Sequence, residues 1–175
     1  MHKSLDTGSP DSEAQAVDKT QLLQSGKYFG RIFLDYLFAH PGFAGPQGKE
    51  ALAHELLTLG QVAGEDRDAL PVKKLIELRW GRQKIPYWLN RALVVLALEQ
   101  GFIPTHIADS VGIVASLIKE LHEPDRRQLR PERSFDFQQL LAYLQTNYQV
   151  TLPPAHHPWV IQYLQDRGYQ IRTTA

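Results

Sequence analysis

Apolar side chains recur along most of the chain at intervals of three and four residues, and short segments rich in glycine, proline and acidic residues separate these stretches. Such spacing places the apolar side chains on one face of a helix. A histidine-proline-glycine step ends the first stretch, and prolines open two of the later ones. Helices are therefore predicted over 22–38, 47–59, 72–79, 87–100, 136–144 and 157–167.

Residues 101–121 have a pattern typical of two short helices joined by a sharp turn. Thr105 is suited to cap the first helix, and Ala108 leaves room for a close helix crossing. Gly112 would supply the turn, where a positive φ is costly for a residue with a Cβ. Ile118 would then lie on the inner face of the second helix. An ordinary helical hairpin with a glycine turn would give nearly the same pattern.

With its small alanine, turn glycine and flanking apolar positions, segment 101–121 resembles the helix-turn-helix family of bacterial transcription factors. The resemblance covers about an eighth of the chain. It implies sequence-specific DNA binding, usually as a dimer. Ser116 and Lys119 would meet bases or phosphates. The candidates for outward positions on the second helix are Val114, Ala115, Ser116, Lys119 and Glu120.

The carboxyl end of the chain favours a small amount of β structure. Residues 169–173 alternate apolar and polar side chains as a strand does, and 150–152 can form another short strand. The phrase over 163–171 resembles the passage from helix into wing in winged-helix proteins. The predicted fold is therefore mainly α: a multi-helix bundle containing a helix-turn-helix, with a small C-terminal β-hairpin or wing.

The chain divides into four segments by composition. Residues 1–19 are small, polar and acidic, and we expect a disordered tail. An N-terminal helical hairpin is predicted over 20–66, and a helical core with the helix-turn-helix over 67–125. A basic arm and a C-terminal α+β element follow over 126–175. Residues 20–175 are expected to form one compact unit.

Charge is balanced overall but unevenly distributed. The formal net charge is zero, whereas residues 71–134 carry eleven lysines and arginines against seven aspartates and glutamates. Two prolines exclude a continuous helix after residue 121, and a basic arm is predicted from Arg126, Arg127, Arg130 and Arg133. An arm beside a recognition helix commonly contacts the phosphate backbone. A plain linker is the equal alternative.

A second basic patch is predicted from Arg79, Arg82 and Lys84, which are interleaved with Trp80, Tyr87 and Trp88. Basic side chains among aromatic rings are used in binding single strands or the nucleic-acid backbone. The charges contact phosphate, and the rings stack on bases or fix the cations. The alternative is that the rings are core anchors and the cations are solvated.

Composition and motifs narrow the chemistry further. The chain has no cysteine, which excludes a disulfide scaffold and cysteine-based zinc or redox chemistry and fits a cytoplasmic protein. The longest apolar run, 92–98, is too short to span a bilayer, so no membrane partner is expected. His156 and His157 are adjacent, and neighbours point apart in regular structure, so we expect no metal site. No nucleotide-binding or hydrolase motif occurs, and we expect no cofactor and no catalytic residues.

These observations predict a cytoplasmic nucleic-acid-binding protein, either a transcriptional regulator or a subunit of a nucleoprotein complex, with DNA or RNA as its partner. A homodimer or a protein partner would use apolar helix faces. The alternative hypothesis is a helical protein-interaction module, in which the aromatic helix 22–38 and the apolar hairpin dock onto another protein without binding nucleic acid.

Overall fold

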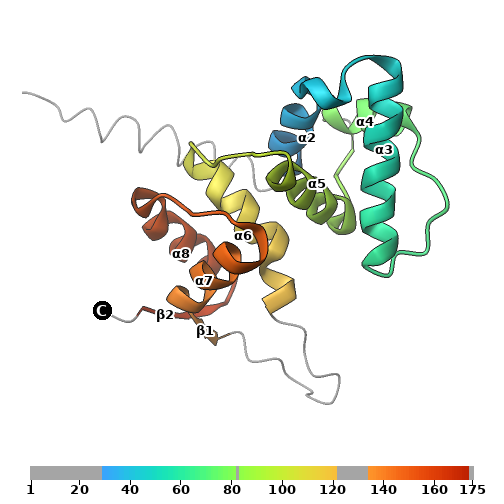
Figure 1. Cartoon of the computed structure of the whole chain (residues 1–175). Helices are drawn as coiled ribbons and strands as arrows, with labels where there is room; N and C mark the ends of the chain where they lie inside the picture. The colour runs from blue at the N-terminus through green and yellow to red at the C-terminus, as the bar shows by residue number, and fades with distance from the viewer. Residues whose placement is uncertain (1–28, 82, 122–133, 174–175) are drawn as a thin grey trace, which may run out of the picture.

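A computed structural model of the chain describes residues 29–81, 83–121 and 134–173 (Figure 1). It confirms the prediction of a mainly α fold. The α-helices are α2 (Phe29–Ala39), α3 (Gly45–Val62), α4 (Val72–Arg79), α5 (Tyr87–Glu99), α6 (Ile107–Leu121), α7 (Phe137–Tyr148) and α8 (His157–Asp166). The 3-10 turns are η1 (Pro41–Phe43) and η2 (Pro154–His156), and the strands are β1 (Ser134–Asp136) and β2 (Gln170–Arg172). The predicted tail 1–19, the first turns of the predicted helix 22–38, Arg82 and the predicted basic arm lie outside the described residues.

Helix α5 lies at the centre of the core. Every side chain from Ala92 to Ala97 is buried, which requires neighbours on all sides of the helix. Helices α2 and α3 pack against α5, and α6 and α7 also contact it (Figure 1). Phe33, Leu34 and Leu37 of α2 are fully buried. The described part of the aromatic helix is therefore a core element.

The end of α5 is fixed by a glycine. Gly101 has a φ of 87°, a conformation that few residues other than glycine adopt readily. Its N–H donates to the carbonyl of Leu98 (3.1 Å), and the N–H of Phe102 donates to the carbonyl of Ala97 (2.9 Å). This pair of bonds is the Schellman arrangement, which satisfies the last carbonyls of a helix. It turns the chain from α5 towards α6.

The predicted turn at Gly112 is wrong. Residues 107–121 form one continuous helix, α6, and Gly112 is buried within it. A Cβ at this glycine would lie 3.1 Å from Cε2 of Phe33 on α2. The residue therefore allows α2 and α6 to approach closely. In the sequence, a glycine that forms a turn and a glycine that allows close packing of helices look the same. The segment 101–121 contains no helix-turn-helix of the predicted geometry.

Helix α6 also begins differently from the prediction. Thr105 was expected to cap it, but the helix starts at Ile107 and the capping group is the Asp109 carboxylate. This carboxylate reaches back to accept from the backbone N–H groups of Thr105 (3.0 Å) and His106 (2.9 Å). An acidic side chain in the first turn that binds free N–H groups stabilises a helix start.

The predicted C-terminal hairpin is also wrong. Strand β2 forms within the predicted segment 169–173, but it pairs in parallel with β1, with Phe135 opposite Ile171. Residues 150–152 are not a strand but part of the irregular connection between α7 and η2, in which Val150 and Leu152 are buried. Two parallel strands need a crossover, and α7 and α8 provide it. The two strands therefore join the start of α7 to the chain that follows α8, and they do not extend from the helices as a wing.

Candidate nucleic-acid interface

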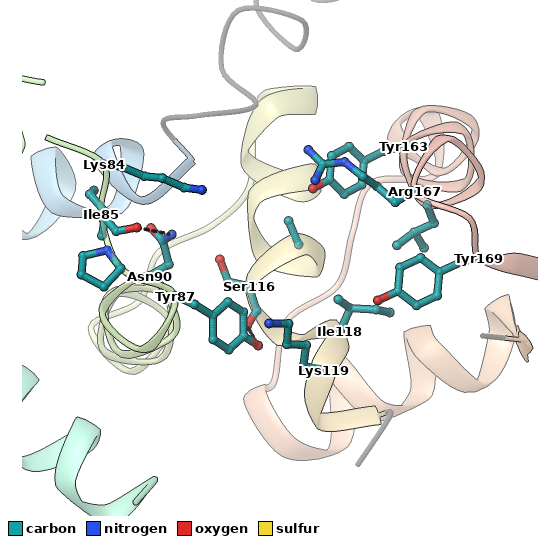
Figure 2. A pocket seen from close by; sticks show the side chains of 13 residues that line it. Lys84, Ile85, Tyr87, Asn90, Ser116, Ile118, Lys119, Tyr163, Arg167 and Tyr169 are labelled. Atoms are coloured by element: carbon teal, nitrogen blue, oxygen red, sulfur yellow. Dashed lines mark hydrogen bonds between the residues drawn. The ribbon is translucent and has the colours of Figure 1, made fainter. Parts of the chain in front are cut away.

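A groove crosses the surface of α6 between the start of α5 and the end of α8 (Figure 2). We call it the α6 groove. It has a volume of about 620 Å³. Its lining residues are Lys84, Ile85, Pro86, Tyr87, Asn90, Ala115, Ser116, Ile118, Lys119, Tyr163, Leu164, Arg167 and Tyr169.

The floor of the α6 groove is formed by one face of α6. Ala115 and Ser116 contribute small side chains there, which leaves the space between the two walls open. Ser116 is only 4% exposed. Its backbone carbonyl accepts a hydrogen bond from the Tyr87 hydroxyl (3.0 Å), which fixes the start of α5 against α6.

Two of the cations at the groove are held over aromatic rings. The Nζ atom of Lys119 lies 4.0 Å from the ring centre of Tyr87, and the guanidinium carbon of Arg167 lies 5.0 Å from that of Tyr163. Attraction between a cation and the face of a ring restrains a long side chain without neutralising its charge. Figure 2 shows the Lys119 pair on the side of α5 and the Arg167 pair on the side of α8.

The α6 groove is electropositive. None of the described residues that line it carries a carboxylate, whereas Lys84, Lys119 and Arg167 each carry a positive charge. Lys84 and Lys119 form no ion pair within the described part of the chain. A concave surface lined by charges of one sign concentrates its field and attracts ions of opposite sign.

Two phenols of the groove, those of Tyr87 and Tyr163, add no negative charge at neutral pH. Burial and then the negative charge of Glu120 raise the pKa of Tyr87 to about 12. Burial also raises the pKa of Tyr163, against the opposing effect of the Arg167 charge. Both rings therefore stay neutral well above physiological pH, and both can hold a cation against their faces.

The carboxylate of Glu120, the residue after Lys119, is bound elsewhere. It accepts hydrogen bonds from the Arg91 guanidinium and from the hydroxyls of Tyr143 (2.8 Å) and Tyr148. Burial acts to lower the pKa of Arg91, but the hydrogen bond and the charge of Glu120 together raise it more. This cluster joins α5, α6 and α7. The Glu120 carboxylate is bound within the cluster and forms no ion pair with Lys119.

The structure brings together only part of the predicted site. Lys84, Ser116 and Lys119 line one groove, although Ser116 was expected to point outward and is instead buried in its floor. Val114 was also expected to point outward and is fully buried. Both expectations were wrong because they assumed a turn at Gly112, whereas a continuous α6 buries these side chains beneath neighbouring helices.

Of the other predicted cations, only Arg79 lies within the described residues. It is not part of the α6 groove: its Nε atom lies 2.8 Å from Oδ1 of Asp35, and its guanidinium lies over the ring of Phe38. Arg82, Arg126, Arg127 and Arg130 lie outside the described residues, and their role stays a prediction.

The groove residues missed from the sequence include Tyr163, Arg167 and Tyr169. Tyr163 lies on α8, and Arg167, four residues later, is the residue that directly follows the helix; this spacing places two side chains at a helix end in contact. That signal was present, because a tyrosine four residues before an arginine near a helix end favours a cation held over a ring. The position of α8 beside Lys84 and Lys119 had no local signal.

Two other features of the described residues bear on chemistry. A buried hydrogen bond of 2.7 Å joins the Ser110 hydroxyl to Nδ1 of His156, but Ser110 is fully buried, which closes this pair to a substrate. Among the described residues, no cluster of three or more histidines and carboxylates is placed to hold a metal ion. No helix within the described ranges has the length and apolar character needed to span a bilayer.

Comparison of the chain with protein-family models, with curated proteins and with solved structures finds no match in any of the three. The proposals that follow rest on the residues and geometry of the α6 groove.

Proposed function

We propose that this protein binds nucleic acid, DNA or RNA, and that the α6 groove is its contact surface. The observation that carries the proposal is the lining of the groove: Lys84, Lys119 and Arg167 with no carboxylate among the described lining residues. The proposal keeps the cytoplasmic location predicted from the sequence.

The chemistry of a phosphate chain suits this lining. Binding between a protein and nucleic acid depends largely on lysines and arginines that replace the counterions of phosphates. A lysine serves as a mobile point charge, and an arginine can donate two parallel hydrogen bonds to a phosphate. Two of the three cations are already restrained over Tyr87 and Tyr163, so less side-chain freedom is lost when they bind.

The competing hypothesis was a protein-interaction module that docks through the aromatic helix and the apolar segment 101–121. The structure uses most of these side chains for its own core. Phe33 and Leu37 of α2 are fully buried, as are Val111 and Ile113 of α6. Most of the surface on which that hypothesis depended is therefore buried in the described part of the chain, with Ile103 (74% exposed) as an exception, and this supports nucleic acid as the partner.

A binding experiment tests the proposal. Fluorescence anisotropy of labelled single-stranded DNA, single-stranded RNA and duplex DNA is measured at two salt concentrations with the full chain. We expect binding to at least one of them and a steep loss of affinity with salt. The double variant Lys84→Gln/Lys119→Gln is expected to bind about tenfold more weakly at low salt, since it loses two charged contacts.

The matched control is Lys73→Gln. Lys73 is exposed on α4 and does not line the α6 groove, so this change removes the same charge at a different place. It is expected to leave the affinity within about twofold, because isolated surface charges have small effects at a distance. An equal loss of affinity in Lys73→Gln and in the double variant Lys84→Gln/Lys119→Gln would contradict the proposal. Absence of binding to all three nucleic acids would also contradict it.

A further inference from the structure

We infer that the α6 groove binds a single-stranded nucleic acid through its phosphates and without preference for base sequence. This inference rests on the proposed function and adds two properties to it: the strandedness of the partner and the absence of base reading. Both follow from the shape of the groove and from the way its polar side chains are engaged.

Shape is the first argument. The α6 groove has walls from the start of α5 and the end of α8, and its floor, including Ser116, is buried (Figure 2). Its volume of about 620 Å³ lies in the range of sites for small molecules, about 300 to 1,000 Å³. A few linked nucleotides fit a space of this size. A duplex is a wide, stiff cylinder and would touch only the rim, whereas a flexible strand can enter.

The continuous α6 is the second argument. Reading a duplex requires a helix that projects far enough to enter the major groove. Helix α6 lies between α5 and α8 and packs against both. Its Val114, Ser116 and Ile118 side chains are all buried, so the helix offers only a narrow exposed face that includes Lys119.

The third argument concerns the polar side chains that line the groove, two of which are already bound or buried within the protein. Base edges are read by amides and guanidinium groups that make paired hydrogen bonds. Asn90 is the only amide side chain among the described lining residues, and its Nδ2 donates to the carbonyl of Ile85 (3.4 Å). Its Oδ1 has no hydrogen-bond partner among the described residues, but it is buried against Gly30, which puts it out of reach of a ligand in the groove. The Tyr87 hydroxyl is likewise committed to Ser116. The Arg167 guanidinium is held over the ring of Tyr163. Lys84 and Lys119 form no ion pair within the described residues, and a lysine ammonium recognises phosphate as a point charge.

The aromatic rings of Tyr87 and Tyr163 support the same inference. Aromatic side chains in single-strand sites usually stack on bases. Here one face of Tyr87 is covered by Lys119, and Arg167 lies over Tyr163, whose edge also packs against Phe29 (ring centres 5.7 Å apart). The rings therefore position cations on both sides of the floor. A strand that follows the groove would place its phosphates between the Lys119 side and the Arg167 side.

Competition between nucleic acids tests the inference. Unlabelled oligo(dT), oligo(dA), a mixed-sequence single strand, its RNA equivalent and the matching duplex, all of equal length, compete with a labelled single strand for the full chain. We expect the single-stranded DNAs to agree within about threefold and the duplex to compete at least about tenfold more weakly. The RNA arm shows whether the groove distinguishes the two kinds of strand.

The salt dependence provides a second measurement. On a single strand each phosphate contact contributes about 0.7 to the slope of log K against log salt. Lys84→Gln and Lys119→Gln should each reduce the slope by about 0.7. Lys119→Arg, which keeps the charge, and Lys73→Gln, which lies outside the groove, should leave it unchanged.

The outcomes separate the two proposals. Equal or tighter binding of the duplex, a tenfold preference between oligo(dT) and oligo(dA), or an unchanged slope in both lysine variants would overturn the inference while leaving nucleic-acid binding intact. Absence of binding to any of these nucleic acids would overturn the proposed function itself.

Discussion

Gly112 of α6 faces the ring of Phe33 of α2 so closely that a Cβ at this glycine would lie 3.1 Å from Cε2 and 3.4 Å from Cζ. Phe33 is fully buried, and its ring packs edge-on against Phe102 (ring centres 5.1 Å apart). The ring therefore has little room to move. The close approach of these two residues joins the N-terminal helices to the helix that forms the floor of the α6 groove.

The variant Gly112→Ala should destabilise the protein. Alanine favours a helix by about 1 kcal/mol relative to glycine, but overpacking a core typically costs about 1 to 3 kcal/mol. We expect a net loss of about 1 kcal/mol in the free energy of unfolding, measured by urea denaturation. In a Phe33→Leu background the ring is gone, and the same change should be neutral or stabilising. A gain in stability from Gly112→Ala alone would mean that α2 and α6 lie further apart.

The variant Glu120→Gln should be more damaging than most single changes. It leaves the Arg91 guanidinium, whose side chain is 27% exposed, without its carboxylate, and it weakens the bonds from Tyr143 and Tyr148. We expect a loss of about 2 kcal/mol in the free energy of unfolding. Adding Arg91→Met should recover part of this loss, because the unpaired charge is then removed. Glu99→Gln on the exposed face of α5 is the control and should stay within about 0.5 kcal/mol.

Stability should fall at alkaline pH through the tyrosines near Glu120. Burial, followed by the hydrogen bond and charge of Glu120, raises the pKa of Tyr148 well above its ordinary value of about 10. Above about pH 10 the unfolded chain loses this proton and the folded chain keeps it, so the free energy of unfolding decreases as pH rises. Below about pH 10 the contribution is fully present.

The Tyr148→Phe variant isolates this effect. Urea denaturation between about pH 8 and about pH 11 should show a shallower fall for the variant, by at most about 1.4 kcal/mol per pH unit. Lysines also titrate in this range, but they are the same in both proteins and cancel in the difference. Parallel curves for the wild type and the variant would show that Tyr148 ionises alike in the folded and unfolded chains.

The variant Arg79→Gln should change neither stability nor nucleic-acid binding by much. Its ion pair with Asp35 joins side chains that are 44% and 53% exposed, and such pairs contribute about 0 to 1 kcal/mol. Arg79 does not line the α6 groove, although the sequence placed it in the same patch as Lys84. Anisotropy titrations should therefore give wild-type affinity for Arg79→Gln. A loss comparable to that of Lys84→Gln would return Arg79 to the binding surface.

The sequence by itself determined most of the helices and some of their ends, with α6 as the exception. Periodic apolar residues place α3, α4, α5, α7 and α8 within a few residues of their predicted positions, because burial of one helix face is written in local spacing. The stop at Gly101 and the cap at Asp136, whose Oδ1 accepts from the Gln138 N–H (2.8 Å), are also local effects. Lys84 was identified as a candidate contact from its place in a basic segment with aromatic residues, and Lys119 from its expected place on the second helix of segment 101–121.

Only the tertiary structure decided what Gly112 does, which strand pairs with β2 and which cations share a groove. A buried glycine beside apolar residues fits a turn as well as a helix crossing, and the choice depends on Phe33, which lies far away in the sequence. The pairing of Phe135 with Ile171 and the meeting of Lys84, Lys119 and Arg167 are likewise contacts between distant segments. Local sequence carries the preference of each helix to form, whereas the packing of helices against one another sets which side chains meet.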